Sequence, residues 1–316
     1  RHRRNFFLAE NSNFLLFVDI FVKLDLVSYF LENLIGAYYK GYMTDFNFFK
    51  MNGLGNDFVI IDQRSNPFEL NENQIKTVCD RKQGIGCDQL IYIRNSDQNE
   101  FYLMKFFNSS GEEISACGNG TRCVANYLMN EMNSNEIKIN TIEKIVSCKK
   151  QEDNSISVEM GTPKFHWDEI PLLHDIKQDA PIFTFGEKMI TDPFFVNIGN
   201  PHAIFFVNEI NDYNIDEFGP VIECNKLFPE KINVSFAKII NDNKILLNVW
   251  ERGAGKTEAC GTAACATVVA AVESGLSKNK VLVRLPGGNL DIHYNENKNI
   301  IMTGHTQWDF EGKFKI

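Results

Sequence analysis

The sequence has no Cys-x-x-Cys motif, no long uncharged apolar run and no excess of basic residues. Its eight cysteines are spread over 316 residues, which is too sparse for a disulfide framework. The shortest gaps, Cys79 to Cys87, Cys117 to Cys123 and Cys260 to Cys265, are all wider than Cys-x-x-Cys. A zinc site assembled from distant parts of the chain is the alternative, and no motif favours it. We therefore expect free thiols in a reducing cytoplasm and no metal site.

A formal net charge of −9 argues against a nucleic-acid partner, because phosphates require a basic protein surface. Residues 1–42 open basic and then turn apolar, as a secretory signal does. Charged residues such as Asp19 and Lys23 interrupt this run, so no segment of about 18 uncharged residues could span a bilayer. We interpret 1–42 as an extension outside the domains, either disordered or an artefact of how the start of the chain was chosen. A targeting segment is the alternative.

Cofactor motifs are incomplete. GAGKT (253–257) resembles the end of a phosphate-binding loop, but Trp250 stands where that loop requires glycine. GIGCD (84–88) lacks the third glycine and the helix of a dinucleotide fingerprint. No lysine has the context of a Schiff-base cofactor. These observations predict that the protein uses no cofactor.

The length suggests about two domains, and the order of elements repeats. From Phe46, strands are predicted at 58–62, 88–94 and 101–108, and a helix at 71–84 that ends at Gly84. A turn cluster near Gly161 opens a second section, with strands at 194–199 and 202–207, a helical stretch, and two more strands. In each section a helix that begins at a cysteine follows the strands. The sequence therefore predicts two similar α+β domains that face each other across a cleft.

The stretches ISACGNGTRCVANYL (114–128) and EACGTAACATVVAAV (258–272) each place a cysteine before a glycine at the start of a predicted helix. A helix N-terminus carries about half a positive charge and several free N–H groups. It binds carboxylates and favours a thiolate, so we expect a thiol there to have a lowered pKa. Gly118 and Gly261 would let a ligand approach the backbone. We predict that Cys117 and Cys260 transfer protons beside a carboxylate site.

Two thiols on opposite sides of a cleft would each face one side of an amino acid Cα. One sulfur can remove the α-proton and the other can return a proton on the opposite face, which inverts the stereocentre. A single free cysteine is more often a small buried hydrophobe, and the repetition of the motif is what favours the chemical role. We assign the buried role to the other six cysteines, Cys79, Cys87, Cys123, Cys148, Cys224 and Cys265.

Several motifs together resemble the diaminopimelate epimerase family: FFKMNGLGNDFVIID, GIGCDQ, FFNSSGEEISACGNGTRC, IGNPHA, INVSF and ERGAGKTEACGTA. The resemblance runs from about Phe46 to the C-terminus and leaves residues 1–42 outside. It implies epimerisation of LL-2,6-diaminoheptanedioate to the meso isomer, without pyridoxal phosphate or metal. That reaction serves lysine and peptidoglycan precursor synthesis.

The resemblance also implies roles for individual residues. Cys260 would accept the proton and Cys117 would donate it in the LL-to-meso direction, with His202 and Glu251 tuning the pKa of the thiols. The substrate is a zwitterion at both ends, which suits neutral amides together with an arginine that clamps a carboxylate. The implied substrate contacts are Asn56, Gln89, Asn108, Gly118, Asn119, Asn200, Asn233, Glu251, Arg252, Gly261 and Thr262.

On the same resemblance, the chain has a domain of residues 43–160 with 304–316 and a domain of residues 161–303, which close on the substrate. A cytoplasmic homodimer is implied, with Phe310 in WDFEGKF at the dimer contact.

Four alternatives are weighed against this reading. A phenazine-type isomerase lacks paired cysteines, and a proline-racemase-like enzyme lacks GNDF and GNPH in this form. Intact Cys117 and Cys260 oppose a non-catalytic binding protein. A thiol-redox protein would cycle these sulfurs through a disulfide. We do expect oxidation to link the two thiols and to inactivate an epimerase.

Overall fold

The computed structural model describes residues 45–96, 101–114, 117–142, 144–176 and 181–316. The predicted extension of residues 1–42 lies outside the described residues. Asn47–Gly312 forms one compact unit. A second unit contains Asp45, Phe46 and Lys313–Ile316 among the described residues, and its Phe46 and Phe314 rings lie 5.9 Å apart. No helix within the described ranges is long and apolar enough to cross a membrane.

Within the described residues, the first half of the chain is a run of strands with two helices. Its elements are β1 (Asp45–Gly53), β2 (Asn56–Asp62), α2 (Glu72–Cys79), β3 (Gln89–Asn95), β4 (Tyr102–Asn108), β5 (Glu113–Ile114), α3 (Gly118–Met132), β6 (Glu136–Asn140), β7 (Ile145–Lys150) and β8 (Ile156–Gly161).

The second half adds a small hairpin and then follows a similar order. Its elements are β9 (Phe183–Phe185), β10 (Lys188–Ile190), β11 (Phe194–Asn197), β12 (Pro201–Phe206), α4 (Ile215–Glu223), β13 (Asn233–Asn241), β14 (Lys244–Glu251), β15 (Gly255–Thr257), α5 (Gly261–Glu273), β16 (Lys280–Leu285), β17 (Gly288–Tyr294), β18 (Ile300–Gly304) and β19 (Gln307–Lys315).

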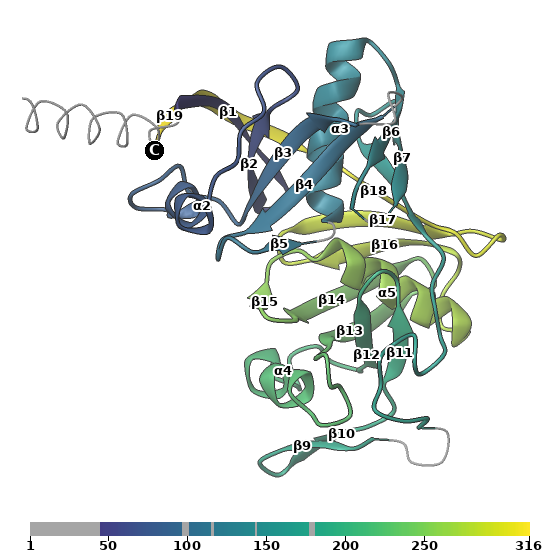
Figure 1. Cartoon of the computed structure of the whole chain (residues 1–316). Coiled ribbons are helices and arrows are strands. Elements are labelled where there is room, and N and C mark those ends of the chain that lie inside the picture. The colour runs from purple at the N-terminus through teal and green to yellow at the C-terminus, as the bar shows by residue number, and fades with distance from the viewer. Residues whose placement is uncertain (1–44, 97–100, 115–116, 143, 177–180) are drawn as a thin grey trace, which may run out of the picture. The chain divides into compact units, whose positions relative to one another are not determined.

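Strand pairing repeats step for step between the halves (Figure 1). In the first half β1–β2 is antiparallel, β2–β3 parallel, β3–β4 antiparallel, β4–β6 parallel, and β6–β7 and β7–β8 antiparallel. The series β11, β12, β13, β14, β16, β17, β18 has the same sequence of directions. The crossover before β6 contains α3, and the crossover before β16 contains α5. The predicted two-fold repeat of an α+β domain is confirmed.

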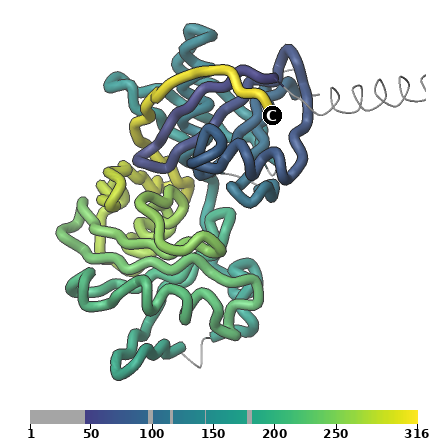
Figure 2. Tube along the Cα trace, turned by 90° about the vertical axis from the view of Figure 1, so that its left-hand side faces the viewer, coloured from purple at the N-terminus to yellow at the C-terminus, as the bar shows by residue number. Residues whose placement is uncertain are grey.

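The pairing of β18 with β8 joins the two halves of the Asn47–Gly312 unit. β18 pairs with β17 on one side and with β8 on the other, both antiparallel. Beyond β18 the chain returns along the start of the first half, where the Trp308 ring stacks on Phe49 at 5.0 Å (Figure 2). The predicted domain bounds, 43–160 with 304–316 and 161–303, stay a prediction.

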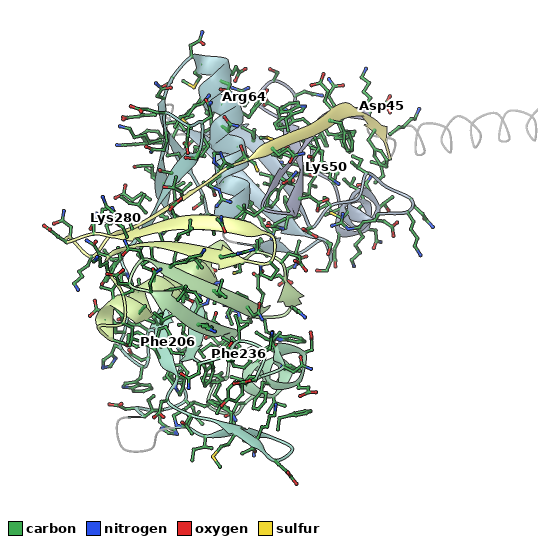
Figure 3. All side chains as sticks on the ribbon, turned by 180° about the vertical axis from the view of Figure 1, so that it is seen from behind. Asp45, Lys50, Arg64, Phe206, Phe236 and Lys280 are labelled. Carbon is green, nitrogen blue, oxygen red and sulfur yellow. The ribbon has the colours of Figure 1, made fainter. Side chains whose placement is uncertain are left out.

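Each cysteine-initiated helix is the centre of a hydrophobic core. α3 contributes Cys123, Val124 and Leu128 to the core of the first half. α5 is buried along nearly its whole length and contributes to a core with β16, β17 and β18. A third core, rich in phenylalanine, lies beyond the other face of β12 and β13 and includes Phe236 (Figure 3). The Phe236 ring lies 5.8 Å from the ring of Phe205. This packing holds both helices in place and thereby fixes the positions of their N-termini.

The predicted helix at 71–84 is too long, because α2 ends at Cys79. Asp80 adopts an extended conformation, and its carboxylate accepts hydrogen bonds from the backbone N–H groups of Lys82 and Gln83, both at 2.7 Å. Such a local turn competes with helix continuation. Strands β1, β7 and β18 and the short strands β5, β9, β10 and β15 were not predicted.

Candidate functional site

Both helices begin at the predicted cysteines. Cys117 is the N-cap of α3 and Cys260 is the N-cap of α5, and both have extended backbone angles. Neither side chain caps its helix, in contrast to the serine, threonine or asparagine that usually occupies this position. Each thiol is therefore available for other contacts beside a set of free backbone N–H groups.

The two helix starts meet inside the Asn47–Gly312 unit. Asn119, in the first turn of α3, donates a hydrogen bond to the carbonyl of Ala259 at 3.4 Å, directly before Cys260. Met302 of β18 lies against both helix-start glycines, because a Cβ on Gly118 would lie 2.7 Å from its Cε and a Cβ on Gly261 would lie 2.7 Å from its Sδ. Only glycine fits this junction without displacing Met302.

Asn56 connects the Cys117 thiol to the rest of the first half. Its Oδ1 accepts a hydrogen bond from Asn119 at 3.3 Å and from the Cys117 thiol at 3.8 Å. Its Nδ2 donates to the Asp88 carboxylate at 2.9 Å. Because a carboxylate only accepts hydrogen bonds, Asp88 fixes the amide so that its oxygen faces the thiol. Asp88 was not predicted as a site residue, although it stands inside the GIGCDQ motif.

The Cys260 thiol lies 3.4 Å from the hydroxyl of Thr262. Asn200 donates to the same hydroxyl at 3.3 Å and accepts a hydrogen bond from Nε2 of His202 at 2.8 Å. His202 is fully buried, and its Nδ1 has no hydrogen-bond partner among the described residues. Burial together with the positive charge of Arg252 lowers the pKa of His202 to about 3, so its imidazole is neutral at physiological pH.

Glu251, at the end of β14, is the carboxylate that acts on both thiols. It accepts hydrogen bonds from the Thr257 hydroxyl at 2.6 Å and from the Cys260 thiol. Burial raises the pKa of the Glu251 carboxyl despite these two bonds. Its negative charge raises the pKa of both Cys117 and Cys260.

Asn233, at the start of β13, links the start of β12 to the turn that follows β14. Its Nδ2 donates to the carbonyl of Pro201 at 2.8 Å, and its Oδ1 accepts from the backbone N–H of Arg252 at 2.9 Å. The Arg252 side chain is exposed and donates to the carbonyl of Glu230 at 3.2 Å. The predicted residues of the second half thus form one connected group at the ends of β12, β13 and β14.

The expectation of lowered thiol pKa values is wrong in direction. Burial raises the pKa of the Cys117 thiol to about 11, although the backbone N–H groups of Asn119 and Gly120 at the helix start lower it. Burial, together with the charge of Glu251, raises the pKa of Cys260 well above its ordinary value. The helix start stabilises each thiolate, but the loss of hydration costs more.

Three other predicted residues have separate surroundings. Gln89 and Asn108 face each other in the register of β3 and β4, and Asn108 accepts hydrogen bonds from Ser110 and Glu112 in its own turn. The Oε1 of Gln89 is buried without a hydrogen-bond partner among the described residues. Phe310 packs edge-on against Phe48 with ring centroids 6.0 Å apart. None of the hydrogen bonds found among the described residues joins Gln89, Asn108 or Phe310 to the thiol of Cys117 or Cys260.

The eight cysteines are free thiols. The prediction that the six others are buried holds for five of them and is wrong for Cys224, which is exposed at the C-terminus of α4. Within the described ranges no three His, Cys, Asp or Glu side chains gather closely enough to hold a metal ion.

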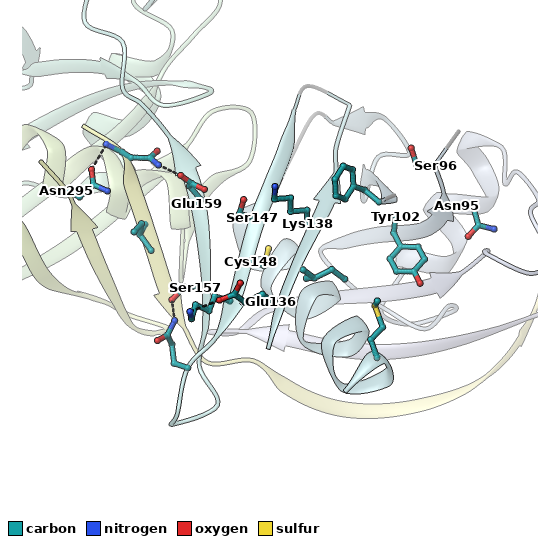
Figure 4. Close-up of a pocket in the computed structure, with 17 residues that line it drawn as sticks. Asn95, Ser96, Tyr102, Glu136, Lys138, Ser147, Cys148, Ser157, Glu159 and Asn295 are labelled. Carbon is teal, nitrogen blue, oxygen red and sulfur yellow. Dashed lines mark hydrogen bonds and ion pairs between the residues drawn. The ribbon is translucent and has the colours of Figure 1, made fainter. Parts of the chain in front are cut away.

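A groove of about 930 Å³ lies elsewhere, over strands β6, β7 and β8 (Figure 4). Its lining includes Lys138, Cys148 and Glu159, and none of the predicted site residues lines it.

Similarity to known proteins covers both halves. The family model for diaminopimelate epimerase matches residues 48–166 and 194–308. A diaminopimelate epimerase from Pelagibacter ubique is 46% identical over 263 residues, which are 82% of this chain and 95% of that protein. One from Phenylobacterium zucineum is 42% identical over 268 residues, covering 84% of this chain and 96% of that protein.

Solved structures share the fold at low sequence identity. A hydroxyproline epimerase from Agrobacterium vitis has a TM-score of 0.62 at 11% identity, covering 86% of this chain and 93% of that chain. A phenazine biosynthesis protein from Bacillus anthracis has a TM-score of 0.57 at 14% identity, covering 86% of this chain and 99% of that chain.

Proposed function

Because the chain belongs to the diaminopimelate epimerase family, we propose that it interconverts LL-2,6-diaminoheptanedioate and the meso isomer with two thiols. The observation that carries this proposal is the meeting of two helix starts, each with an uncapped cysteine thiol. Two positively polarised termini bind the carboxylate of an amino acid, and two thiols provide one acid and one base.

The proton transfers follow from the surroundings of each sulfur. In the LL-to-meso direction we assign the base to Cys260, whose thiol bonds to the Glu251 carboxylate that can receive its proton. Because burial raises the pKa of a thiol, its thiolate is a stronger base than an exposed thiolate and can better remove a weakly acidic α-hydrogen. Cys117, with a pKa of about 11, holds its proton at neutral pH and is assigned the role of donor. In the meso-to-LL direction the two cysteines exchange these roles.

Substrate contacts are proposed on the same basis. Buried amide oxygens without partners among the described residues, those of Asn119 and Gln89, are available to the ammonium groups of a zwitterion. The Arg252 guanidinium can bind the distal carboxylate through two parallel N–H···O hydrogen bonds. The remaining proposed contacts are Asn56, Asn108, Gly118, Asn200, Asn233, Glu251, Gly261 and Thr262, with His202 holding Asn200.

The wider assignments are part of this proposal. We place the enzyme in lysine and peptidoglycan precursor synthesis, in the cytoplasm, as a homodimer in contact through Phe310, with no cofactor. The two domains close across a cleft that holds the substrate. A disulfide between Cys117 and Cys260 would block both proton transfers.

The test is α-hydrogen exchange in D2O with LL-diaminopimelate and reduced protein. We expect deuterium at one stereocentre together with meso product, and a loss of at least ~100-fold in Cys117→Ser and in Cys260→Ser, the scale of a general acid or base. Cys224→Ser is the matched control, because this exposed thiol lies outside the proposed site. Folded wild type that catalyses no exchange would refute the substrate assignment and direct the search to other amino acids, starting with proline.

A further inference from the structure

Arg122, in the second turn of α3, is the largest fully buried side chain among the described residues. Its Nη1 lies 3.4 Å from the sulfur of Met302. Its Nε and Nη2 have no hydrogen-bond partner within the described part of the chain. None of the ion pairs found there includes Arg122.

Two glycines make room for this guanidinium. A Cβ on Gly53, at the end of β1, would lie 3.1 Å from Nη2. A Cβ on Gly304, at the end of β18, would lie 3.3 Å from Nε and from Cζ. Long helical side chains lean toward the helix N-terminus, and this one reaches Met302, which also packs against Gly118 and Gly261. The guanidinium therefore lies behind the two helix starts, separated from them by one side chain.

A buried arginine without a carboxylate is costly. The guanidinium keeps its proton in proteins, and a buried charge that lacks a partner destabilises the fold, whereas an apolar side chain of similar volume often does not. The two helix N-termini beside it are also positively polarised. This concentration of fixed positive charge suits an anion bound in the site.

We infer that Arg122 is a positioning residue of the proposed epimerase site, whose charge stabilises the thiolate of Cys117 and the substrate carboxylate at the helix starts. The carboxylate part rests on the proposed function. Arg122 lowers the pKa of Cys117, acting against burial and against the charge of Glu251. The other titratable groups that face the guanidinium are Cys123 of α3 and Cys265 of α5.

Arg122→Met, which has similar length and no charge, tests the inference together with Arg122→Lys, which keeps the charge. The first readout is the rate at which iodoacetamide alkylates Cys117 at mildly alkaline pH, followed on the Cys117 peptide by mass spectrometry. The second is KM and kcat for diaminopimelate, and the third is the midpoint of thermal unfolding. Arg64→Met is the matched control, since Arg64 lies in the same half but pairs with Asp62 and Glu131 (Figure 3).

For Arg122→Met we expect alkylation to slow roughly 3- to 10-fold, since a nearby charge shifts a pKa by up to a unit or more. KM should rise, and the unfolding midpoint should stay or increase. Arg122→Lys should recover the alkylation rate. Arg64→Met should lower the unfolding midpoint and leave alkylation unchanged.

Alkylation and KM equal to wild type in a folded Arg122→Met variant would overturn the inference, as would a loss of stability with no change in either readout. If the Met variant does not fold, Arg122→Lys decides, because slow alkylation with the charge retained would also overturn it. The alkylation readout needs no substrate. A wild type that fails to epimerise diaminopimelate would therefore refute the proposed function while this arm still tests the effect of Arg122 on Cys117.

Discussion

Burial outweighs hydrogen bonding in setting the acidity of the two thiols at the helix starts. The backbone N–H groups at each start lower the pKa of Cys117 and Cys260, and the low-dielectric surroundings raise it further than they lower it. Glu251 adds to the increase at both sulfurs. One carboxylate thus couples two thiols that belong to different halves of the chain.

Glu251→Gln should change two readouts in opposite directions. Loss of the negative charge should lower the pKa of Cys117 and speed its alkylation at mildly alkaline pH by roughly 2- to 5-fold. Epimerase activity should fall by at least ~10-fold, because the amide cannot accept the Cys260 proton. Alkylation rates by peptide mass spectrometry and the deuterium exchange assay measure the two effects.

The control for this charge removal is Glu258→Gln, since Glu258 is exposed and stands two positions before Cys260. It should leave both readouts near wild type. An equal increase in Cys117 alkylation in the two variants would point to a general effect of net charge and contradict the role given to Glu251.

Among single residues, the sequence allowed the prediction of those in a repeated motif. It did not allow the prediction of contacts between residues that are far apart in the chain. Cys117 and Cys260 could be predicted because the same cysteine–glycine start occurs twice. Arg122 and Met302 lie 180 positions apart, and no local pattern links them. The direction of the thiol pKa shift was also out of reach, because it depends on burial by strands from both halves.

At the scale of elements, the starts of α3 and α5 share one methionine. Met302 fills the positions that a Cβ on Gly118 or on Gly261 would occupy. Its side chain also contacts Arg122. The spacing between the two helices is therefore set by a residue of β18 rather than by either helix.

Gly118→Ala should destabilise the protein by ~1–3 kcal/mol, the cost of overpacking a filled core. Alanine in an open helix position would instead stabilise by up to ~1 kcal/mol relative to glycine, so the clash with Met302 decides the sign. Urea denaturation of the variant and of wild type gives the change in the free energy of unfolding.

A double-mutant cycle isolates this contact. In a Met302→Ala background the added methyl group has room, so Gly118→Ala should become neutral or stabilising. The same loss of stability in both backgrounds would show that Met302 is not the cause.

Periodicity and turn residues were sufficient to predict most of the longer elements, although not β1. The strands β2, β3, β4, β13 and β14 and the helices α3 and α5 follow from their apolar runs and glycine boundaries. The end of α2 was missed because the Asp80 carboxylate satisfies the following N–H groups locally. Strand β15 is only three residues long and depends on pairing with β14, which the local sequence does not encode.

At the scale of the whole molecule, the returning strand β19 leaves two aromatic side chains in contact with solvent. Trp308 is 45% and Phe310 is 47% exposed. Trp308 stacks on Phe49 and Phe310 packs edge-on against Phe48, so each ring is held by an aromatic neighbour while it stays partly exposed. Aromatic residues held in this way are common in protein interfaces, and this supports the proposed homodimer.

Phe310→Asp should convert a dimer into a monomer, since a charge at the centre of an apolar contact is strongly disfavoured. Sedimentation velocity should show the mass halved, and circular dichroism should be unchanged. Met189→Asp is the control, because Met189 is an exposed apolar residue on β10 and should leave the dimer intact. A wild-type protein that is already monomeric would contradict the homodimer.

The matching strand directions of the two halves have a consequence for origin. Duplication of a gene for one half, followed by fusion, produces such a chain, and before fusion two identical subunits would each have supplied one thiol. In the present chain the two sites differ: Cys260 is buried and bonds to Glu251, whereas Cys117 is partly exposed and bonds to Asn56. The two thiols of the repeat thus have different surroundings, which the proposed assignment of one acceptor and one donor requires.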